Sequence, residues 1–187
     1  MSDYHRNLPH WLPAGPAIFL TWRLHGSLLA CVLQELREEK TLTAGQEFAL
    51  ADQHMDRAGA GPLWLKDTRI AECVSHYLEL GDSKFHRYDL HSCVVMANHV
   101  PVLLTPKIGM QWITKSLKGI TARLCNQILQ RTKGPFWQQG SCDHWCRDDV
   151  EFQRIRDYIA RNPVKAGLVS KPELWLCSSA HRLGRLR

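Results

Sequence analysis

The sequence lacks the features of a membrane-spanning or secreted protein. No apolar run in its 187 residues approaches the ~18 residues that a membrane-spanning helix needs. The N-terminal stretch MSDYHRNLPHWLPAG has no long apolar core, so we expect no secretory signal. The seven cysteines are odd in number and form no CxxC pair, which favours reduced thiols. We therefore expect a cytoplasmic protein with no membrane partner.

Acidic residues are absent from one long segment. No Asp or Glu lies between Asp89 and Asp143. The segment carries six basic residues, Lys107, Lys115, Lys118, Arg123, Arg131 and Lys133. The net charge of +6 comes from this segment, because the other 18 basic residues balance the 18 acidic residues of the chain. A one-sided positive field favours a polyanionic partner such as nucleic acid, and a solvated basic helix without a partner is the alternative.

The sequence also shows no internal repeat, linker or low-complexity tract, and its length suits one domain. We expect a single domain over residues 1–187, with an N-terminal arm of about 1–15 and a C-terminal tail of about 170–187 at its periphery. Apolar and β-favouring patterns predict strands at 17–24, about 86–96 and 99–105, a short strand or extended piece at 61–67, and helices at 43–58, 67–80, 109–130 and 148–162. Gly81 and Pro163 are expected to end two of the helices. This mixture predicts an α+β fold with helices packed on a sheet.

The stretch VVMANHVPVLL, residues 94–104, predicts an antiparallel hairpin. Ala97 and Asn98 would form its turn, since Asn tolerates the positive φ that such turns require. A two-residue turn places Met96 opposite His99 and Val94 opposite Pro101. Side chains alternate along a strand, so His99 and Pro101 would project from the same face of the sheet.

The helix at 148–162 carries a tyrosine among basic residues. Asp148 and Glu151 have the spacing of an N-terminal capping box. Tyr158 and Asn162 are four residues apart and share a face, and Arg154 and Arg161 lie near it. A tyrosine hydroxyl flanked by arginines could attack a phosphate, because the guanidinium groups stabilise the developing charge. The alternative is a tyrosine packed at the helix edge with its hydroxyl in water.

Three stretches together resemble the REP-associated tyrosine transposases, which belong to the insertion-sequence-200-like, single-tyrosine HUH group. They are YDLHSCVVMANHVPVLLTP, SLKGITARLCNQIL and PFWQQGSCDHWCRDDVEFQRIRDYIARNPVKAGLV. The resemblance runs from about NLPHWLPAG to PELWLCSSA, nearly the whole chain. It implies a ferredoxin-like α+β fold whose antiparallel sheet carries the HUH motif, His-hydrophobic-His.

The resemblance also implies a chemistry and its residues. A Mg²⁺ or Mn²⁺ ion would be bound by the two motif histidines and by a polar residue on the tyrosine helix, at positions that match His99, Pro101 and Asn162. The nucleophile matches Tyr158. It would attack a phosphate of single-stranded DNA and form a 5′-phosphotyrosine and a free 3′-hydroxyl.

The implied partner is DNA, expected as single-stranded hairpins formed by palindromic repeats. Basic residues would follow its backbone, and the candidates are Lys115, Lys118, Arg123, Arg131, Lys133, Arg154 and Arg161. The resemblance is compatible with a monomer or with a homodimer that exchanges the tyrosine helix.

This sequence departs from the family pattern at the motif itself, because HVP stands where the family has HVH. Pro101 supplies no ligand and removes a backbone donor from the strand. Three interpretations follow: an inactive transposase that keeps its fold and DNA binding, an active enzyme with a substituted ligand such as water, Asp143 or His144, or a repurposed DNA- or RNA-binding protein. A metal-independent enzyme unrelated to nucleic acid is a weaker alternative.

Overall fold

The computed structural model describes residues 15–27 and 61–184, so the helix expected at 43–58 and most of the N-terminal arm lie outside the described residues. One antiparallel sheet contains four strands, β1 (Ile18–Arg23), β2 (Tyr88–Cys93), β3 (His99–Pro106) and β4 (Cys142–Trp145). The longer helices of the described ranges are α3 (Thr68–Ser83), α4 (Met110–Ile128) and α5 (Asp149–Lys165), and α6 (Ser179–Gly184) is short. The succession β1-α3-β2-β3-α4-β4 with sheet order β2-β3-β1-β4 is a ferredoxin-like arrangement, which confirms the α+β prediction.

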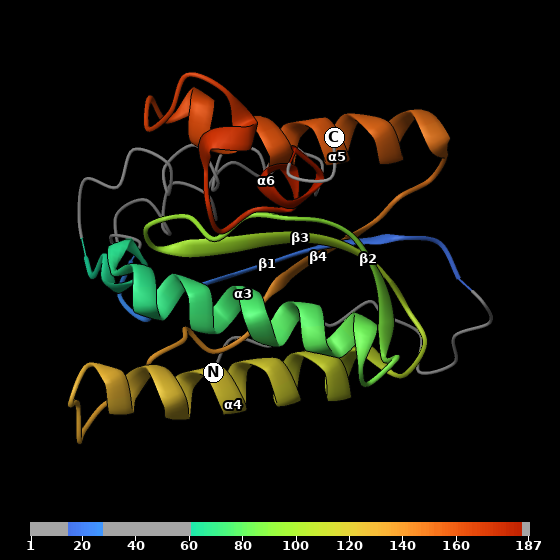
Figure 1. Cartoon of the computed structure of the whole chain (residues 1–187). Helices are drawn as coiled ribbons and strands as arrows, with labels where there is room; N and C mark the ends of the chain where they lie inside the picture. The colour runs from blue at the N-terminus through green and yellow to red at the C-terminus, as the bar shows by residue number, and fades with distance from the viewer. Residues whose placement is uncertain (1–14, 28–60, 185–187) are drawn as a thin grey trace, which may run out of the picture.

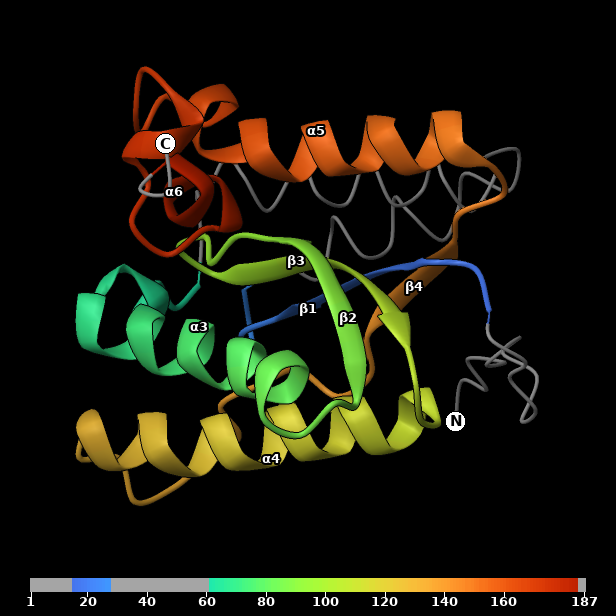
Figure 2. The same ribbon diagram turned by 45° about the vertical axis from the view of Figure 1, so that its right-hand side comes forward.

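Helices cover both faces of the sheet. Figures 1 and 2 show α3 and α4 side by side on one face and α5 on the other. Alternate residues of β1 divide between two cores, because Leu20 and Trp22 pack toward α3 and α4 whereas Phe19 packs toward α5 with Leu103 and Ile159. The sheet is therefore the middle layer of three, and each strand offers one row of side chains to each helical layer.

Gly81 does not end its helix, contrary to the sequence prediction. Helix α3 continues to Ser83, and the positive φ of +48° beyond it belongs to His86. Gly81 serves packing instead, since a β-carbon there would lie 2.0 Å from the hydroxyl oxygen of Tyr88. That hydroxyl donates to the carbonyl of Leu78 at 2.7 Å, which holds the first residue of β2 against α3.

Pro163 does not end α5 either, and the prediction of a helix end at Asn162 was wrong. The helix runs on to Lys165 with Pro163 inside its last turn. Pro163 has no backbone N–H to donate, but the Ala166 N–H still donates to the Asn162 carbonyl at 3.0 Å. The last turn of the helix therefore forms with the proline inside it. The piece at 61–67 was also predicted incorrectly, because it contains a single 3₁₀ turn at Trp64–Lys66.

The chain after α5 returns to the edge of the sheet beside β2. The Val95 N–H donates to the Cys177 carbonyl at 2.9 Å, and the Trp175 indole N–H donates to the Val95 carbonyl at 2.9 Å. Arg182 of α6 pairs with Glu79 of α3. Cys177 is a free thiol, as are Cys73, Cys93, Cys125 and Cys146. Within the described ranges no helix is long and apolar enough to cross a membrane.

Candidate active site

The hairpin that carries His99 has the register predicted from the sequence. The Met96 N–H donates to the His99 carbonyl at 3.0 Å, and the Val94 N–H donates to the Pro101 carbonyl at 3.2 Å. Leu103, two residues beyond Pro101, packs in the core beneath α5. Because residues two apart share a face, His99 and Pro101 also face α5.

Pro101 lies in an interior strand of the sheet yet leaves most of the pairing intact. β3 lies between β2 and β1, and Pro101 stands opposite Thr21 of β1. In a hydrogen-bonded antiparallel pair, the nitrogen and carbonyl of a residue point to the same neighbour, which here is Val94. The proline therefore removes the single bond that its N–H would have donated toward Val94, and the ladder to β1 is retained.

His99 is fully buried and has a defined ring orientation. Its exposed fraction is 0%, and its Nδ1 lies 2.7 Å from the side-chain oxygen of Asn98. An amide oxygen accepts, so Nδ1 is the donor of this hydrogen bond. Metal-binding histidines are commonly held in one tautomer by such a contact to the second nitrogen. The adjacent Asn98 thus orients His99.

Helix α5 begins at a well-formed cap. The Asp148 carboxylate accepts from the Glu151 N–H at 2.7 Å, as the spacing predicted. The Glu151 carboxylate in turn accepts from the Arg147 backbone N–H at 2.8 Å and contacts His144 Nε2 at 3.0 Å. Hydrogen bonds from the Arg147 side chain and backbone, assisted by His144, lower the pKa of Glu151 to about 2. The start of α5 is therefore attached to the end of β4.

From this cap α5 runs back across the sheet toward the end that carries the 97–98 turn (Figures 1 and 2). It buries Ile159, Asn162 and Pro163, and Asn162 has an exposed fraction of 0%. Asn162 therefore lies in the layer between α5 and the sheet, into which His99 and Pro101 also project. The structure brings these three predicted positions into one layer.

Tyr158 lies at the border between this layer and solvent. It is half-buried, and its ring meets Phe19 edge to face with centroids 6.3 Å apart. The ammonium of Lys165 lies 4.4 Å from the centre of the Tyr158 ring. Arg154 and Arg161 are exposed and stand four residues before and three residues after Tyr158, which places them along the same edge of α5. Sequence reasoning missed Lys165, although its position two helical turns after Tyr158 could have indicated it.

The donors around Pro101 fit a divalent ion in kind, although the set is small. His99 offers an imidazole nitrogen and Asn162 an amide oxygen, both of which Mn²⁺ accepts. Thr21, directly opposite Pro101, is 2% exposed, and its hydroxyl has no hydrogen-bond partner among the described residues. In residues 15–27 and 61–184, no three His, Cys, Asp or Glu side chains cluster as a metal site.

Neither substitute ligand considered from the sequence stands beside Pro101. Asp143 pairs with Leu20 of β1, whose side chain packs on the α3 and α4 side of the sheet. His144 pairs with Phe19 and so faces α5, but its Nε2 is engaged by Glu151. On β4, the residue paired with Thr21 in the backbone register is Cys142.

The remaining predicted DNA-binding residues lie on the far side of the sheet from Tyr158. Lys115, Lys118 and Arg123 belong to α4, and Arg131 and Lys133 follow it. Lys118 donates to the carbonyls of Gln138 and Gly140, and the Arg131 guanidinium lies 3.8 Å from the ring centre of Trp64. These two side chains hold neighbouring segments. Lys115, Arg123 and Lys133 are exposed.

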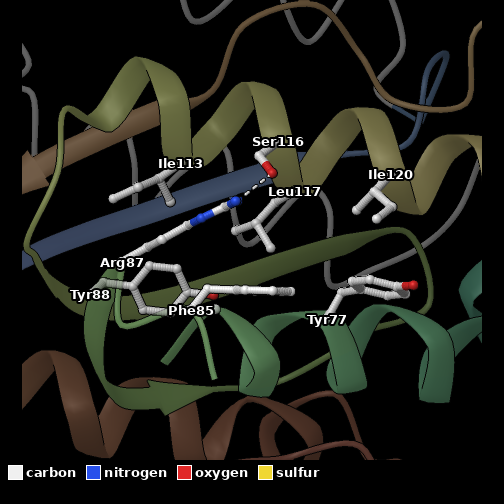
Figure 3. A pocket seen from close by; sticks show the side chains of 9 residues that line it. Tyr77, Phe85, Arg87, Tyr88, Ile113, Ser116, Leu117 and Ile120 are labelled. Atoms are coloured by element: carbon white, nitrogen blue, oxygen red, sulfur yellow. Dashed lines mark hydrogen bonds between the residues drawn. The ribbon is translucent and has the colours of Figure 1, made fainter. Parts of the chain in front are cut away.

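Two exposed aromatic residues accompany these cations. Trp112 is 60% exposed with the Lys115 ammonium 5.7 Å from its ring, and Phe85 is 45% exposed with Arg87 at 4.9 Å. Figure 3 shows Phe85 and Arg87 at a small cavity between α3 and α4, where Arg87 donates to the Ser116 hydroxyl at 2.6 Å. This cavity is on the opposite face of the sheet from Tyr158.

Comparisons with known proteins identify a family and a solved structure with a similar fold. The family described as "Transposase IS200 like" matches residues 67–162, about half of the chain. The solved structure of a REP-associated tyrosine transposase bound to a REP hairpin has 20% sequence identity and a TM-score of 0.57, over 99% of this chain and 87% of that one. A solved protein of Deinococcus radiodurans R1, described as a candidate transposase, has 17% identity and a TM-score of 0.33, over 87% of this chain and 98% of that one. No curated protein matches the chain.

Proposed function

Because the chain belongs to the IS200-like transposase family, we propose that it binds single-stranded DNA hairpins and that Tyr158 nicks and transfers a strand through a covalent phosphotyrosine. One observation carries the proposal. Helix α5 holds Tyr158 and Asn162 over the face of the sheet to which His99 belongs, with Arg154 and Arg161 along the same edge of the helix. The candidate nucleophile, the candidate ligand pair and the cations that would bind phosphate thus share one region.

The residues of the chain would act as follows. Arg154 and Arg161 would hold the phosphates on either side of the scissile bond. The Tyr158 oxygen would attack phosphorus, the bond from phosphorus to the 3′-oxygen would break, and the 5′-phosphate would remain on the tyrosine. Since one phosphodiester replaces another, a 3′-hydroxyl can reverse the step and rejoin DNA without a nucleotide cofactor.

His99 and Asn162 are the residues that would hold Mg²⁺ or Mn²⁺, which when bound polarises a phosphate oxygen. The orientation of His99 by Asn98 suits this role, because it directs Nε2 away from Asn98. Thr21 is the further oxygen donor next to Pro101.

Hairpin DNA is proposed as the substrate for two reasons. The relative with the similar fold is bound to a REP hairpin. The exposed cations of α4 and α5 also provide positive charge that can neutralise DNA phosphates. Trp112 and Phe85 offer rings on which unpaired bases can stack.

A second candidate function is hairpin binding without cleavage. Pro101 favours it, because the proline replaces one of the donors that the family pattern supplies and leaves one imidazole at the site. Loss of one protein ligand weakens metal binding strongly. Binding would then be the same in Mn²⁺ and in a chelator, whereas the nicking reaction needs the ion.

A denaturing-gel assay with labelled hairpin DNA and Mn²⁺ separates the two functions. The parent protein is compared with Tyr158→Phe and with Pro101→His, which restores the family motif. An adduct that requires Tyr158 supports the nicking function. An adduct formed by Pro101→His alone supports the binding function, with chemistry lost at one ligand. An adduct that survives Tyr158→Phe removes Tyr158 from the reaction.

A further inference from the structure

Lys165 occupies an unusual position at the end of α5. Its ammonium lies over the ring of Tyr158, 4.4 Å from the ring centre, and the same ring is packed against Phe19. Side chains of a helix lean toward its N-terminus, so a lysine two turns after the tyrosine reaches back along the helix. The contact therefore follows from helix geometry.

The Lys165 ammonium is also available to a ligand. The residue is exposed, and no carboxylate of the described ranges forms an ion pair with it. Glu151, the carboxylate at the start of the helix, is engaged by Arg147 and His144. Exposed contacts between a cation and a ring are weak, so an anion can draw the ammonium away from the ring at little cost.

Lys165 completes a row of cations on the edge that carries Tyr158. Positions −4, +3 and +7 relative to Tyr158 are Arg154, Arg161 and Lys165, and these spacings place all four side chains along one side of a helix. The three cations are exposed, whereas Asn162 and Ile159 on the neighbouring side are buried. The row is thus a track for a phosphate backbone with the tyrosine inside it.

We propose that Lys165 is a catalytic residue of the strand-transfer reaction, in which its ammonium pairs with the scissile phosphate as Tyr158 attacks. The inference rests on the proposed role of Tyr158. As the bond from the tyrosine oxygen to phosphorus forms and the bond from phosphorus to the 3′-oxygen breaks, the phenol proton passes to solvent and the leaving oxygen takes a proton from solvent. Lys165 stays protonated and stabilises the negative charge that accumulates on the phosphoryl oxygens.

The Pro101 position increases the importance of such a cation. With one imidazole at the candidate ion site, less of the charge stabilisation can come from a bound ion, and an ammonium beside the nucleophile would supply it instead. Arginine at position 165 would keep the charge and the ring contact, whereas methionine would keep the length of the side chain alone.

The test compares Lys165→Met and Lys165→Arg with Lys171→Met, an exposed lysine beyond the helix that serves as a matched control. All are made in the parent and in Pro101→His. Adduct formation is followed in single turnover at saturating hairpin DNA, and hairpin affinity is measured separately by fluorescence anisotropy. We expect Lys165→Met to slow the adduct step by ~10- to 100-fold, with affinity changed by less than about 3-fold, and Lys165→Arg and Lys171→Met to stay near the parent.

The outcomes distinguish this inference from the function on which it rests. A Tyr158-dependent adduct that forms equally fast in Lys165→Met overturns the role of Lys165 and leaves Tyr158 in place. Loss of affinity without a change in rate assigns Lys165 to binding and also overturns the proposal. Absence of an adduct in both the parent and Pro101→His overturns the role of Tyr158, and that of Lys165 with it.

Discussion

Among single residues, Pro101 has the largest consequence for the candidate site. It keeps its carbonyl bond to Val94 and its place opposite Thr21, so the strand tolerates it structurally. Its chemical effect is greater, because it contributes no donor to the layer that holds His99 and Asn162. The fold of the site and its ability to bind an ion can therefore be separated by changing this residue.

Pro101→His is expected to increase stabilisation by Mn²⁺. A ligand that binds the native state at 100 times its Kd adds about 2.7 kcal/mol to the free energy of unfolding. For a chain of this size, 1 kcal/mol corresponds to roughly 2–4 °C in Tm. We expect millimolar Mn²⁺ to raise the Tm of Pro101→His by several degrees more than that of the parent, measured by circular dichroism against EDTA.

Pro101→Val is the matched control, because it restores the backbone N–H without adding a donor atom. The Tm of Pro101→Val is expected to exceed that of the parent by the same amount in Mn²⁺ as in EDTA. An Mn²⁺-specific shift of the same size in the valine variant would place the ion elsewhere in the protein.

The placement of His99 and Pro101 could be predicted from the sequence because a two-residue turn leaves one register for the strands that it joins. The contact of Asn98 with His99 was not predicted, since it depends on side-chain rotamers within the turn. Thr21 was missed for a different reason. Its position opposite Pro101 depends on the pairing of β1 with β3, and strand order in a sheet cannot be read from local patterns.

Among the helices and strands, the two wrong helix ends have a common cause. Gly81 and Pro163 are helix terminators by local preference, and each is the last buried residue of a helix that continues for two further residues. Gly81 is needed where Tyr88 approaches the helix, and Pro163 is itself buried. Tertiary packing overrides local preference at both positions.

Gly81→Ala is expected to destabilise the protein by about 1–3 kcal/mol, as overpacking of a tight contact does. The added carbon would lie 2.0 Å from the Tyr88 hydroxyl oxygen and displace its bond to Leu78. Gly119→Ala in α4 is the matched control, because a β-carbon there meets nothing within 4 Å. That control should stabilise by about 0.5–1 kcal/mol. Urea unfolding measures both, and equal effects in the two variants would show that the packing argument is wrong.

The attachment of α5 to β4 predicts a pH dependence. Hydrogen bonds from Arg147, with help from His144, lower the pKa of Glu151 to about 2 from an ordinary value of 4.5. A lowered carboxyl pKa gives stability that is present above the unfolded pKa and is lost as the pH falls toward the folded one. Glu151→Gln should therefore cost about 1–2 kcal/mol at pH 7, and the difference from the parent should shrink below about pH 4.5.

Urea unfolding at a series of pH values between 7 and 3 measures this difference. Glu173→Gln changes an exposed carboxylate for which no ion pair is found within the described ranges, and it should leave the free energy of unfolding unchanged at each pH. A constant gap between Glu151→Gln and the parent down to pH 3 would mean that the ionised carboxylate is not what stabilises the start of α5.

At the scale of the described molecule, the sheet separates the predicted DNA-binding cations into two groups. Lys115 and Arg123 are exposed on α4, and Arg154 and Arg161 are exposed on α5, across the sheet from each other (Figure 1). The sequence predicted that both groups contact DNA, but it did not predict that they lie on opposite faces of the sheet. Neither the segment without acidic residues nor the tyrosine helix has a sequence pattern that indicates which face of the sheet it covers. A single straight segment of DNA cannot lie against both groups.

The two groups are therefore expected to differ in what they control. Met at both Lys115 and Arg123 should weaken hairpin binding at low salt and reduce the slope of log affinity against log salt by about 1 for each lost phosphate contact. The same variant should form the adduct at the parent rate when DNA is saturating, because α4 does not reach the face that carries Tyr158.

Replacing both Arg154 and Arg161 with Met should slow the adduct step itself, since these side chains flank the nucleophile. Anisotropy titrations over a range of salt concentrations and single-turnover gels measure the two effects separately, and a slower adduct step in the α4 variant at unchanged affinity would mean that both faces belong to one catalytic surface.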